Sequence, residues 1–163
     1  MKKIKIFSLV AILLGGLFLL SGCGQKELTG SLEDIMNDLN EYTFKGYADD
    51  EKPMLMNIKV LEEQPDNIEY FIGTTDIEYK EILASEPTMS SIAYSVVLVK
   101  MKEGSDIEGA KQKILDNVNP AKWWCVEVPK EDVIVKNRGN VIILIMVNDE
   151  TFREKLDKGF DKI

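Results

Sequence analysis

The chain of 163 residues contains no histidine. This absence excludes Ser-His and Cys-His nucleophile pairs and the His-Glu-x-x-His zinc motif. It also removes the side chain that most often acts as a general base near neutral pH. No glycine-rich phosphate-binding loop occurs anywhere after Gly22. We therefore expect no catalytic residue of a common class, no bound metal and no other cofactor.

Basic residues are also fewer than acidic ones: the chain has 20 Lys and Arg but 28 Asp and Glu. Three of these lysines precede Gly22, so the part of the chain after Gly22 has a net charge of −11. Nucleic-acid binding requires a basic footprint, so we expect no nucleic-acid partner. Anionic lipid headgroups would repel this part of the chain, so its own charge gives it no affinity for a membrane surface.

Long apolar runs are absent as well, and the longest one spans only positions 6–20. An α-helix needs roughly 20 apolar residues to cross a bilayer, so this run is too short. Lys2, Lys3 and Lys5 precede the run, and small residues follow it. A basic start, a short apolar run and a small-residue end together predict a secretory signal peptide. The alternative is a plain transmembrane anchor.

The end of this segment, Leu20-Ser21-Gly22-Cys23, resembles the lipobox of bacterial lipoproteins. The resemblance implies that Cys23 receives a diacylglyceryl group, that a signal peptidase cuts before it, and that its amine is acylated with a fatty acid such as palmitate. Two or three acyl chains anchor a protein stably. We therefore expect a signal peptide over 1–22, a lipidated tether over 23–30 and an extracytoplasmic domain over 31–163, held at the cell membrane. An unlipidated signal peptide is the alternative.

Lipid on Cys23 leaves Cys125 as the last thiol, so no internal disulfide bond can form. The chain from Cys23 to Ile163 is long enough for one domain with a core of its own. Free cysteine is among the most buried residue types, so we expect Cys125 to be buried and inert. A reactive thiol is the alternative, for which Lys122 is the only nearby activating cation.

The spacing of apolar residues predicts an α+β domain, with a mainly antiparallel sheet of about four strands and two to three packed helices. Residues 92–102 are apolar on both faces through Val99, which predicts a central strand. Ser105 and Glu108 form an expected capping box, and Asp149 an expected helix cap. The helices are expected at 31–42, 105–118 and from 149 onward, the strands at 54–61, 77–84, 92–102, 133–136 and 141–147 with a turn at 137–140, and a short helix or turn within 62–73.

Four stretches form a recognisable series along the second half of the chain: Ser85-Glu86-Pro87, residues 92–100, Glu103-Gly104 before Ser105, and residues 135–141. In this order they resemble lipoproteins of low-GC Gram-positive bacteria that carry the domain of unknown function 4358. The resemblance covers roughly half of the chain after Cys23, and it implies a location and a domain but no activity or site residues. The chain departs from the family in a shorter helix, in a Trp-rich insert, and in Val141 where members often have an aromatic residue.

The most unusual stretch is residues 119–128, Asn-Pro-Ala-Lys-Trp-Trp-Cys-Val-Glu-Val. Adjacent Trp rings offer a large contact area, so Trp123 and Trp124 are candidates for a partner surface. The alternative is that one ring packs in the core and the other over its edge. A strand conformation would favour that alternative, because neighbouring side chains of a strand point to opposite faces.

Acidic clusters offer weaker candidates. Asp49-Asp50-Glu51 and Asn148-Asp149-Glu150 contain ligands that calcium prefers, but neither matches an EF-hand loop, and solvated loop charge is the better interpretation. Glu62-Glu63 could act as an acid pair, although neighbours in sequence seldom converge on one substrate.

Two classes of function remain open. The first is a non-enzymatic binding or accessory module of the cell envelope, whose partner is another envelope protein or a cell-wall ligand. The second is a small carboxylate-dependent cell-wall hydrolase, which requires a cleft with two facing carboxylates and a raised pKa. A transporter's ligand-delivering lipoprotein is disfavoured, since the chain after Gly22 is too short for two lobes.

Overall fold

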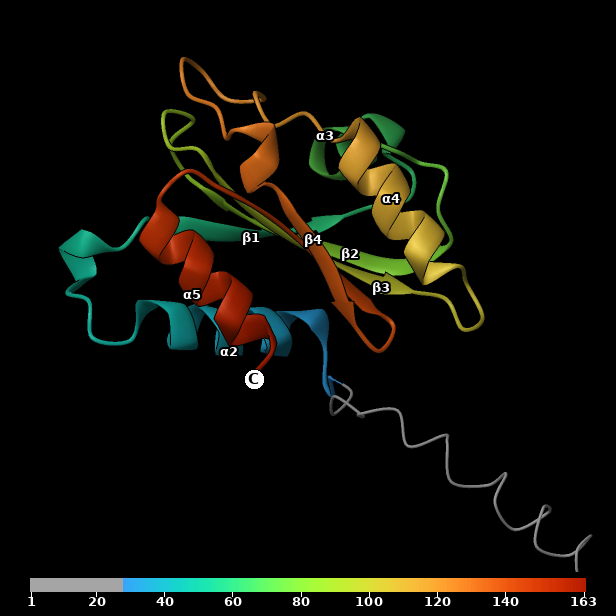
Figure 1. Ribbon diagram of the computed structural model, residues 1–163, viewed down its shortest axis with the longest axis horizontal. Coiled ribbons are helices and arrows are strands. Elements are labelled where there is room, and N and C mark those ends of the chain that lie inside the picture. Colours follow the sequence, from blue (N-terminus) through green and yellow to red (C-terminus); the bar gives the residue numbers. More distant parts are fainter. Residues whose placement is uncertain (1–27) are drawn as a thin grey trace, which may run out of the picture.

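The computed structural model describes residues 28–163, in which five strands form one antiparallel sheet and four α-helices pack on it (Figure 1). The α+β prediction is confirmed, with one strand and one helix more than expected. The expected signal peptide, Cys23 and most of the expected tether lie outside the described residues. The elements are α2 (Leu32–Phe44), the 3-10 turn η1 (Asp49–Glu51), β1 (Leu55–Val60), α3 (Pro65–Ile72), β2 (Tyr79–Pro87), β3 (Tyr94–Met101), α4 (Ile107–Asn117), the 3-10 turn η2 (Lys130–Asp132), β4 (Ile134–Arg138), β5 (Val141–Val147) and α5 (Glu150–Phe160).

The strand order is β1-β2-β3-β5-β4, so β3 lies in the centre as its apolar faces predict. Helices cover both faces of the sheet, α3 and α4 on one and α2 and α5 on the other (Figure 1). Because both faces are covered, every residue of β5 is buried. Ile142, Leu144 and Met146 face α3 and α4, whereas Ile143 and Ile145 face α2 and α5.

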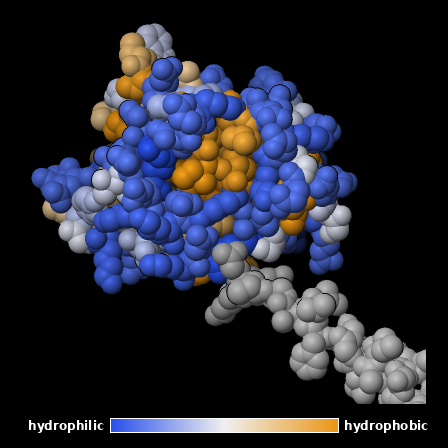
Figure 2. Space-filling model, in the orientation of Figure 1, coloured by the Kyte–Doolittle hydropathy of each residue, from blue (hydrophilic) through white to orange (hydrophobic). Residues whose placement is uncertain are grey.

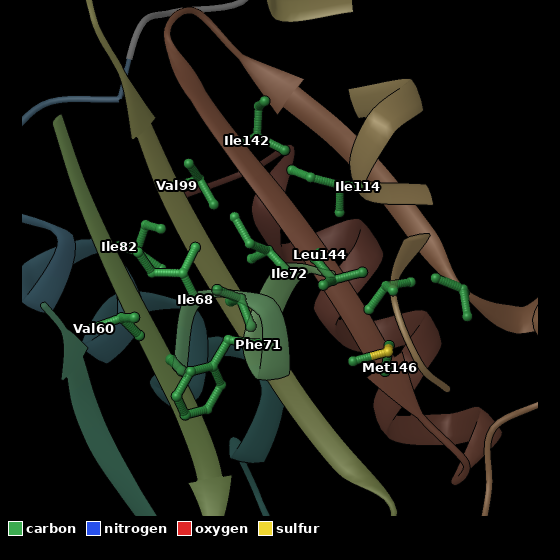
Figure 3. Packing of buried hydrophobic residues seen from close by; sticks show 14 of the residues in the cluster. Val60, Ile68, Phe71, Ile72, Ile82, Val99, Ile114, Ile142, Leu144 and Met146 are labelled. Atoms are coloured by element: carbon green, nitrogen blue, oxygen red, sulfur yellow. The ribbon is translucent and has the colours of Figure 1, made fainter. Parts of the chain in front are cut away.

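The core beneath α3 and α4 is entirely apolar at its centre (Figure 3). Ile68, Phe71 and Ile72 project from α3 and Ile114 from α4 toward the strands. The sequence pattern of residues 62–73 allows either a short helix or a turn. Burial of the α3 side chains, which recur at helical spacing, is what stabilises the helix there.

The core on the other face is formed by α2 and α5, which run antiparallel. The Phe44 ring at the end of α2 lies 5.2 Å from the Phe152 ring near the start of α5. Gly159 allows the helices to approach closely, because a Cβ there would lie 2.7 Å from the Tyr42 ring. The predicted Asp149 cap is confirmed, since its carboxylate accepts a hydrogen bond from Phe152 N at 2.9 Å.

Two local predictions are wrong. Asp106 rather than Ser105 caps α4, accepting from Gly109 N at 2.9 Å, while the Ser105 hydroxyl donates to the carbonyl of Glu78 at 3.1 Å. The hairpin turn is also shorter than expected, because β4 continues through Arg138. Arg138 is buried and donates to the carbonyl of Phe160 at 2.7 Å, which holds it in the strand.

The sheet has two ends with different surroundings. Leu28, the Gly139–Asn140 turn and Ile163 lie at one end, which we call the tether end, since the described chain enters there. Figure 1 shows the segment between α4 and β4 at the opposite end of the molecule. We call that opposite end the loop end and define it as residues 52–54, 88–93, 121–128 and 148–149.

Candidate partner-binding site

Backbone hydrogen bonds join the loop-end segments to one another. Thr88 N donates to the carbonyl of Met54 at 2.9 Å, and Trp124 N donates to the carbonyl of Ser90 at 3.3 Å. Asn148 N donates to the carbonyl of Ala93 at 3.0 Å. Segments that are far apart in the sequence therefore form one continuous surface.

The two tryptophans have different surroundings in this surface. Trp123 is 7% exposed and packs in the core beneath α3 and α4, whereas Trp124 is 79% exposed. The segment is irregular rather than a strand, with turn geometry on both sides of the pair. One ring is thus a core residue, and only Trp124 is placed to contact a partner.

Lys122 fastens this segment to the sheet. Its ammonium group pairs with Glu86 Oε1 on β2 and donates to Ser95 Oγ on β3 at 3.1 Å. The side chains of Lys122 and Glu86 are only 2% and 10% exposed. A buried charge pair of this kind holds one geometry, because losing either partner leaves an uncompensated charge inside the protein.

Aromatic rings surround the same ammonium group. Lys122 Nζ lies 4.4 Å from the centre of the Tyr70 ring, 5.0 Å from Phe71 and 5.4 Å from Trp123. Burial lowers the pKa of Lys122, and the charge of Glu86 opposes that effect. Partial burial and the same carboxylate raise the pKa of Tyr70. The sequence offered no signal for this cluster, since its members come from α3, β2, β3 and a loop.

Cys125 is exposed, and the expectation of a buried cysteine is wrong. Its φ of 60° turns the chain just after Trp124. Lys122, the one cation expected to activate the thiol, has its ammonium group buried beside Glu86. The structure therefore shows an accessible cysteine whose expected activating cation is engaged elsewhere.

A hollow of about 520 Å³ opens at the loop end next to this segment. Its apolar wall consists of side chains from four parts of the chain, and its polar edge includes Glu51 and Asp149. The volume lies in the range of small-ligand and side-chain pockets. The apolar wall is formed by Pro53, Ile92, Ala93, Val126, Val147 and Phe152.

The two carboxylates at the hollow are engaged in backbone contacts. Glu51 Oε2 accepts from Ala48 N at 2.8 Å, and Asp149 caps α5. Each carboxylate at the hollow therefore accepts a hydrogen bond that stabilises its own local backbone. The only buried carboxylate among residues 28–163 is Glu86, which is paired with Lys122. Glu62 and Glu63 are exposed in the turn before α3, away from the hollow's walls.

The acidic clusters form no metal centre in the described part of the chain, where no three Asp, Glu or Cys side chains gather in a suitable group. Asp49 pairs instead with Lys52, at 2.9 Å between Oδ1 and Nζ.

Exposed apolar side chains lie close in sequence to residues that line the hollow. Met54 is 74% exposed and Met89 59%, and both belong to segments that the backbone bonds above join to Trp124. Figure 2 shows hydrophobic residues on the protrusion that Figure 1 places between α4 and β4. A second apolar area in Figure 2 lies over β4 between α4 and α5, where Ile134 and Val135 are half-buried.

Comparison with known proteins adds no relative, since no protein-family model, curated protein or solved structure matches this chain. Within residues 28–163, no helix has both the length and the apolar character needed to span a bilayer.

Proposed function

We propose that this protein is a lipid-anchored accessory module of the bacterial cell envelope, which binds a partner through its loop end and performs no catalysis. Lipid on Cys23 holds it at the extracytoplasmic face of the cell membrane. The stretches whose sequence resembles lipoproteins with the domain of unknown function 4358 would imply the same location.

The observation that carries the binding role is the exposure of Trp124 on a segment held by a buried ion pair. A large aromatic side chain that is 79% exposed gains much from being covered by a partner. The Lys122–Glu86 pair and the bond from Trp124 N to the Ser90 carbonyl hold the chain just before the ring and at its own backbone. Less conformational entropy is then lost on binding.

The position of Trp124 agrees with this role. The described chain begins at the tether end, and the loop end lies on the opposite side of the sheet (Figure 1). A strand of the length of β3 is roughly 26 Å long. Anchoring at the tether end would therefore present Trp124 on the side away from the bilayer, toward other envelope components.

Two experiments test the two parts of the proposal. For the anchor, cells that express the wild type and Cys23→Ala are labelled with a fatty-acid analogue and fractionated. We expect label and membrane association in the wild type only, and equal labelling of the variant contradicts the anchor.

For binding, a photo-crosslinking amino acid replaces Trp124 in living cells, and Glu103 in a matched control. Glu103 is exposed beyond β3, near the tether end. We expect one recurrent adduct from position 124 and none from 103. Equal adducts from both positions, or none from either, contradict a partner surface at the loop end.

A further inference from the structure

The hollow at the loop end is large enough to hold an inserted side chain. Its volume of about 520 Å³ exceeds that of any single residue and leaves room for part of a neighbouring one. Ile92, Val126 and Phe152 contribute apolar surface from three separate elements, so a group that enters contacts protein on several sides. An aromatic or branched aliphatic group would remove much apolar area from water in this position.

The border of the hollow suits a polypeptide. Met54, Met89 and Trp124 are exposed and lie within two residues of the lining residues Pro53, Ser91 and Val126, and methionine adapts its shape to irregular partners. Such a border covers the residues beside an inserted anchor and excludes water from it. A small free ligand would occupy the hollow and leave this apolar border uncovered.

The charge around the hollow is negative. Five exposed acidic side chains line it or lie next to a lining residue in the sequence. The cations in this region have partners already: Lys52 pairs with Asp49, Arg153 pairs with Asp132, and Lys155 lies 4.2 Å from the Tyr47 ring. The acidic residues are Asp50, Glu51, Glu127, Asp149 and Glu150.

We propose that the hollow binds an aromatic or branched aliphatic side chain of an envelope polypeptide whose neighbouring residues are lysine or arginine. This inference rests on the proposed binding function and specifies its partner. Basic neighbours meet the acidic border, which favours encounter and orientation. Anionic cell-wall polymers and anionic lipid headgroups meet repulsion at the same border.

The test uses full-length protein in detergent micelles and a fluorescent peptide with one Phe between lysines, followed by anisotropy. Two further peptides carry Ala in place of Phe, or Glu in place of Lys.

The protein variants change the hollow itself. Ser91→Trp places a ring at the hollow from an exposed lining residue, with Ser91→Ala as its control. Glu51→Gln and Asp149→Asn remove charge but keep an acceptor oxygen for Ala48 N and Phe152 N. Glu103→Gln removes the same charge near the tether end.

We expect Ser91→Trp to weaken binding of the Phe-Lys peptide about ten-fold. Glu51→Gln and Asp149→Asn each weaken it about three-fold, as exposed charge pairs do, whereas Ser91→Ala and Glu103→Gln leave it unchanged. The Ala and Glu peptides bind at least about ten-fold more weakly than the Phe-Lys peptide. Thermal unfolding of each variant confirms that its fold is intact.

Equal binding of the three peptides overturns the inference, and so does equal weakening by Glu103→Gln, which indicates unspecific attraction to an acidic protein. Tighter binding of peptidoglycan fragments than of the Phe-Lys peptide also overturns it. These outcomes differ from failure of the proposed function, which is the absence of a specific adduct at position 124. An adduct at 124 with no preference for the basic peptide leaves the binding module standing and removes only this partner chemistry.

Discussion

The ammonium group of Lys122 is buried against the carboxylate of Glu86, and this pair joins the tryptophan-containing segment to the end of β2. Ser95 on β3 accepts from the same ammonium group, so the pair spans two strands. A single lysine in an irregular segment thus sets the position of the neighbouring Trp124.

Loss of the Glu86 charge is expected to destabilise the protein. Glu86→Gln leaves the Lys122 ammonium group buried without a counter-charge, which costs about 3 kcal/mol of unfolding free energy in urea denaturation. Glu81→Gln on the same strand is the control, because its pair with Lys59 is 3.5 Å long and the Lys59 side chain is 61% exposed. It should cost less than about 1 kcal/mol. Equal stability of the two variants would show that the buried pair has no special role.

Replacement of the whole pair should be tolerated better than removal of one member. The double variant Lys122→Met with Glu86→Leu fills the space with apolar side chains and leaves no charge unpaired. We expect it to recover most of the stability that Glu86→Gln loses, again in urea denaturation. A double variant less stable than both single variants contradicts this account.

The adjacent tryptophans should respond differently to truncation. Trp123→Ala removes a buried ring and is expected to cost about 3 to 5 kcal/mol of unfolding free energy. Trp124→Ala removes a ring that is 79% exposed and should change stability by less than about 0.5 kcal/mol. Acrylamide should quench the fluorescence of Trp123→Phe, which retains Trp124, more strongly than that of Trp124→Phe. The reverse order of quenching would show that Trp124, rather than Trp123, is the buried ring.

Tyr94 should make the protein sensitive to alkali. Its ring is buried and its hydroxyl has no hydrogen-bond partner among residues 28–163, and burial raises its pKa far above the usual 10.0. The unfolded chain then loses the proton more easily than the folded one, so stability is complete below pH 10 and falls as pH rises above 10. Tyr94→Phe should lose less stability between pH 8 and pH 11 than the wild type.

At pH 8 the same variant should be more stable than the wild type by about 1 kcal/mol, because an unpaired buried hydroxyl is removed. Tyr47→Phe, on the connection between α2 and η1, controls for the loss of one tyrosine. Urea denaturation at both pH values measures the effect. Parallel loss of stability in the wild type and in Tyr94→Phe would contradict it.

The number of free thiols per chain tests both the exposure of Cys125 and the acylation of Cys23. Cys125 is exposed, so a thiol reagent should modify it in the folded protein within minutes. Protein purified from membranes should contain one reactive thiol per chain, and Cys125→Ala should contain none, since acylation blocks Cys23. A thiol that reacts in the Cys125→Ala protein would show that Cys23 is unmodified.

Periodicity in the sequence predicted the longer elements because their stability depends on burial of one face. The apolar residues at Leu32, Ile35, Met36 and Leu39 predicted α2, and all four are buried. Short-range details were harder to predict. Ser105 and Asp106 are both good helix caps by type, and the carbonyl of Glu78, which is distant in the chain but close in space, engages Ser105.

The candidate site likewise has one feature that the sequence predicts and others that depend on tertiary contacts. The sequence identified the Trp pair as a candidate surface, but the direction of each ring depends on contacts with α3, β2 and β3. The Lys122 cluster combines residues that are far apart in the chain, and no local pattern brings Tyr70 and Lys122 together. Likewise, Cys125 is exposed because the backbone turns at that residue, which its residue type alone does not indicate.

The sequence by itself determined the fold class, the order of the main elements and the central position of β3, because these follow from where apolar side chains recur along the chain. The expectation of a lipid on Cys23 also rests on sequence alone, and the fatty-acid labelling experiment tests it. Only the tertiary structure decided which Trp is exposed, how Lys122 is held and where the hollow opens. Those features depend on contacts between residues from separate elements at one end of the sheet. Such contacts between distant parts of the chain cannot be read from the order of the residues.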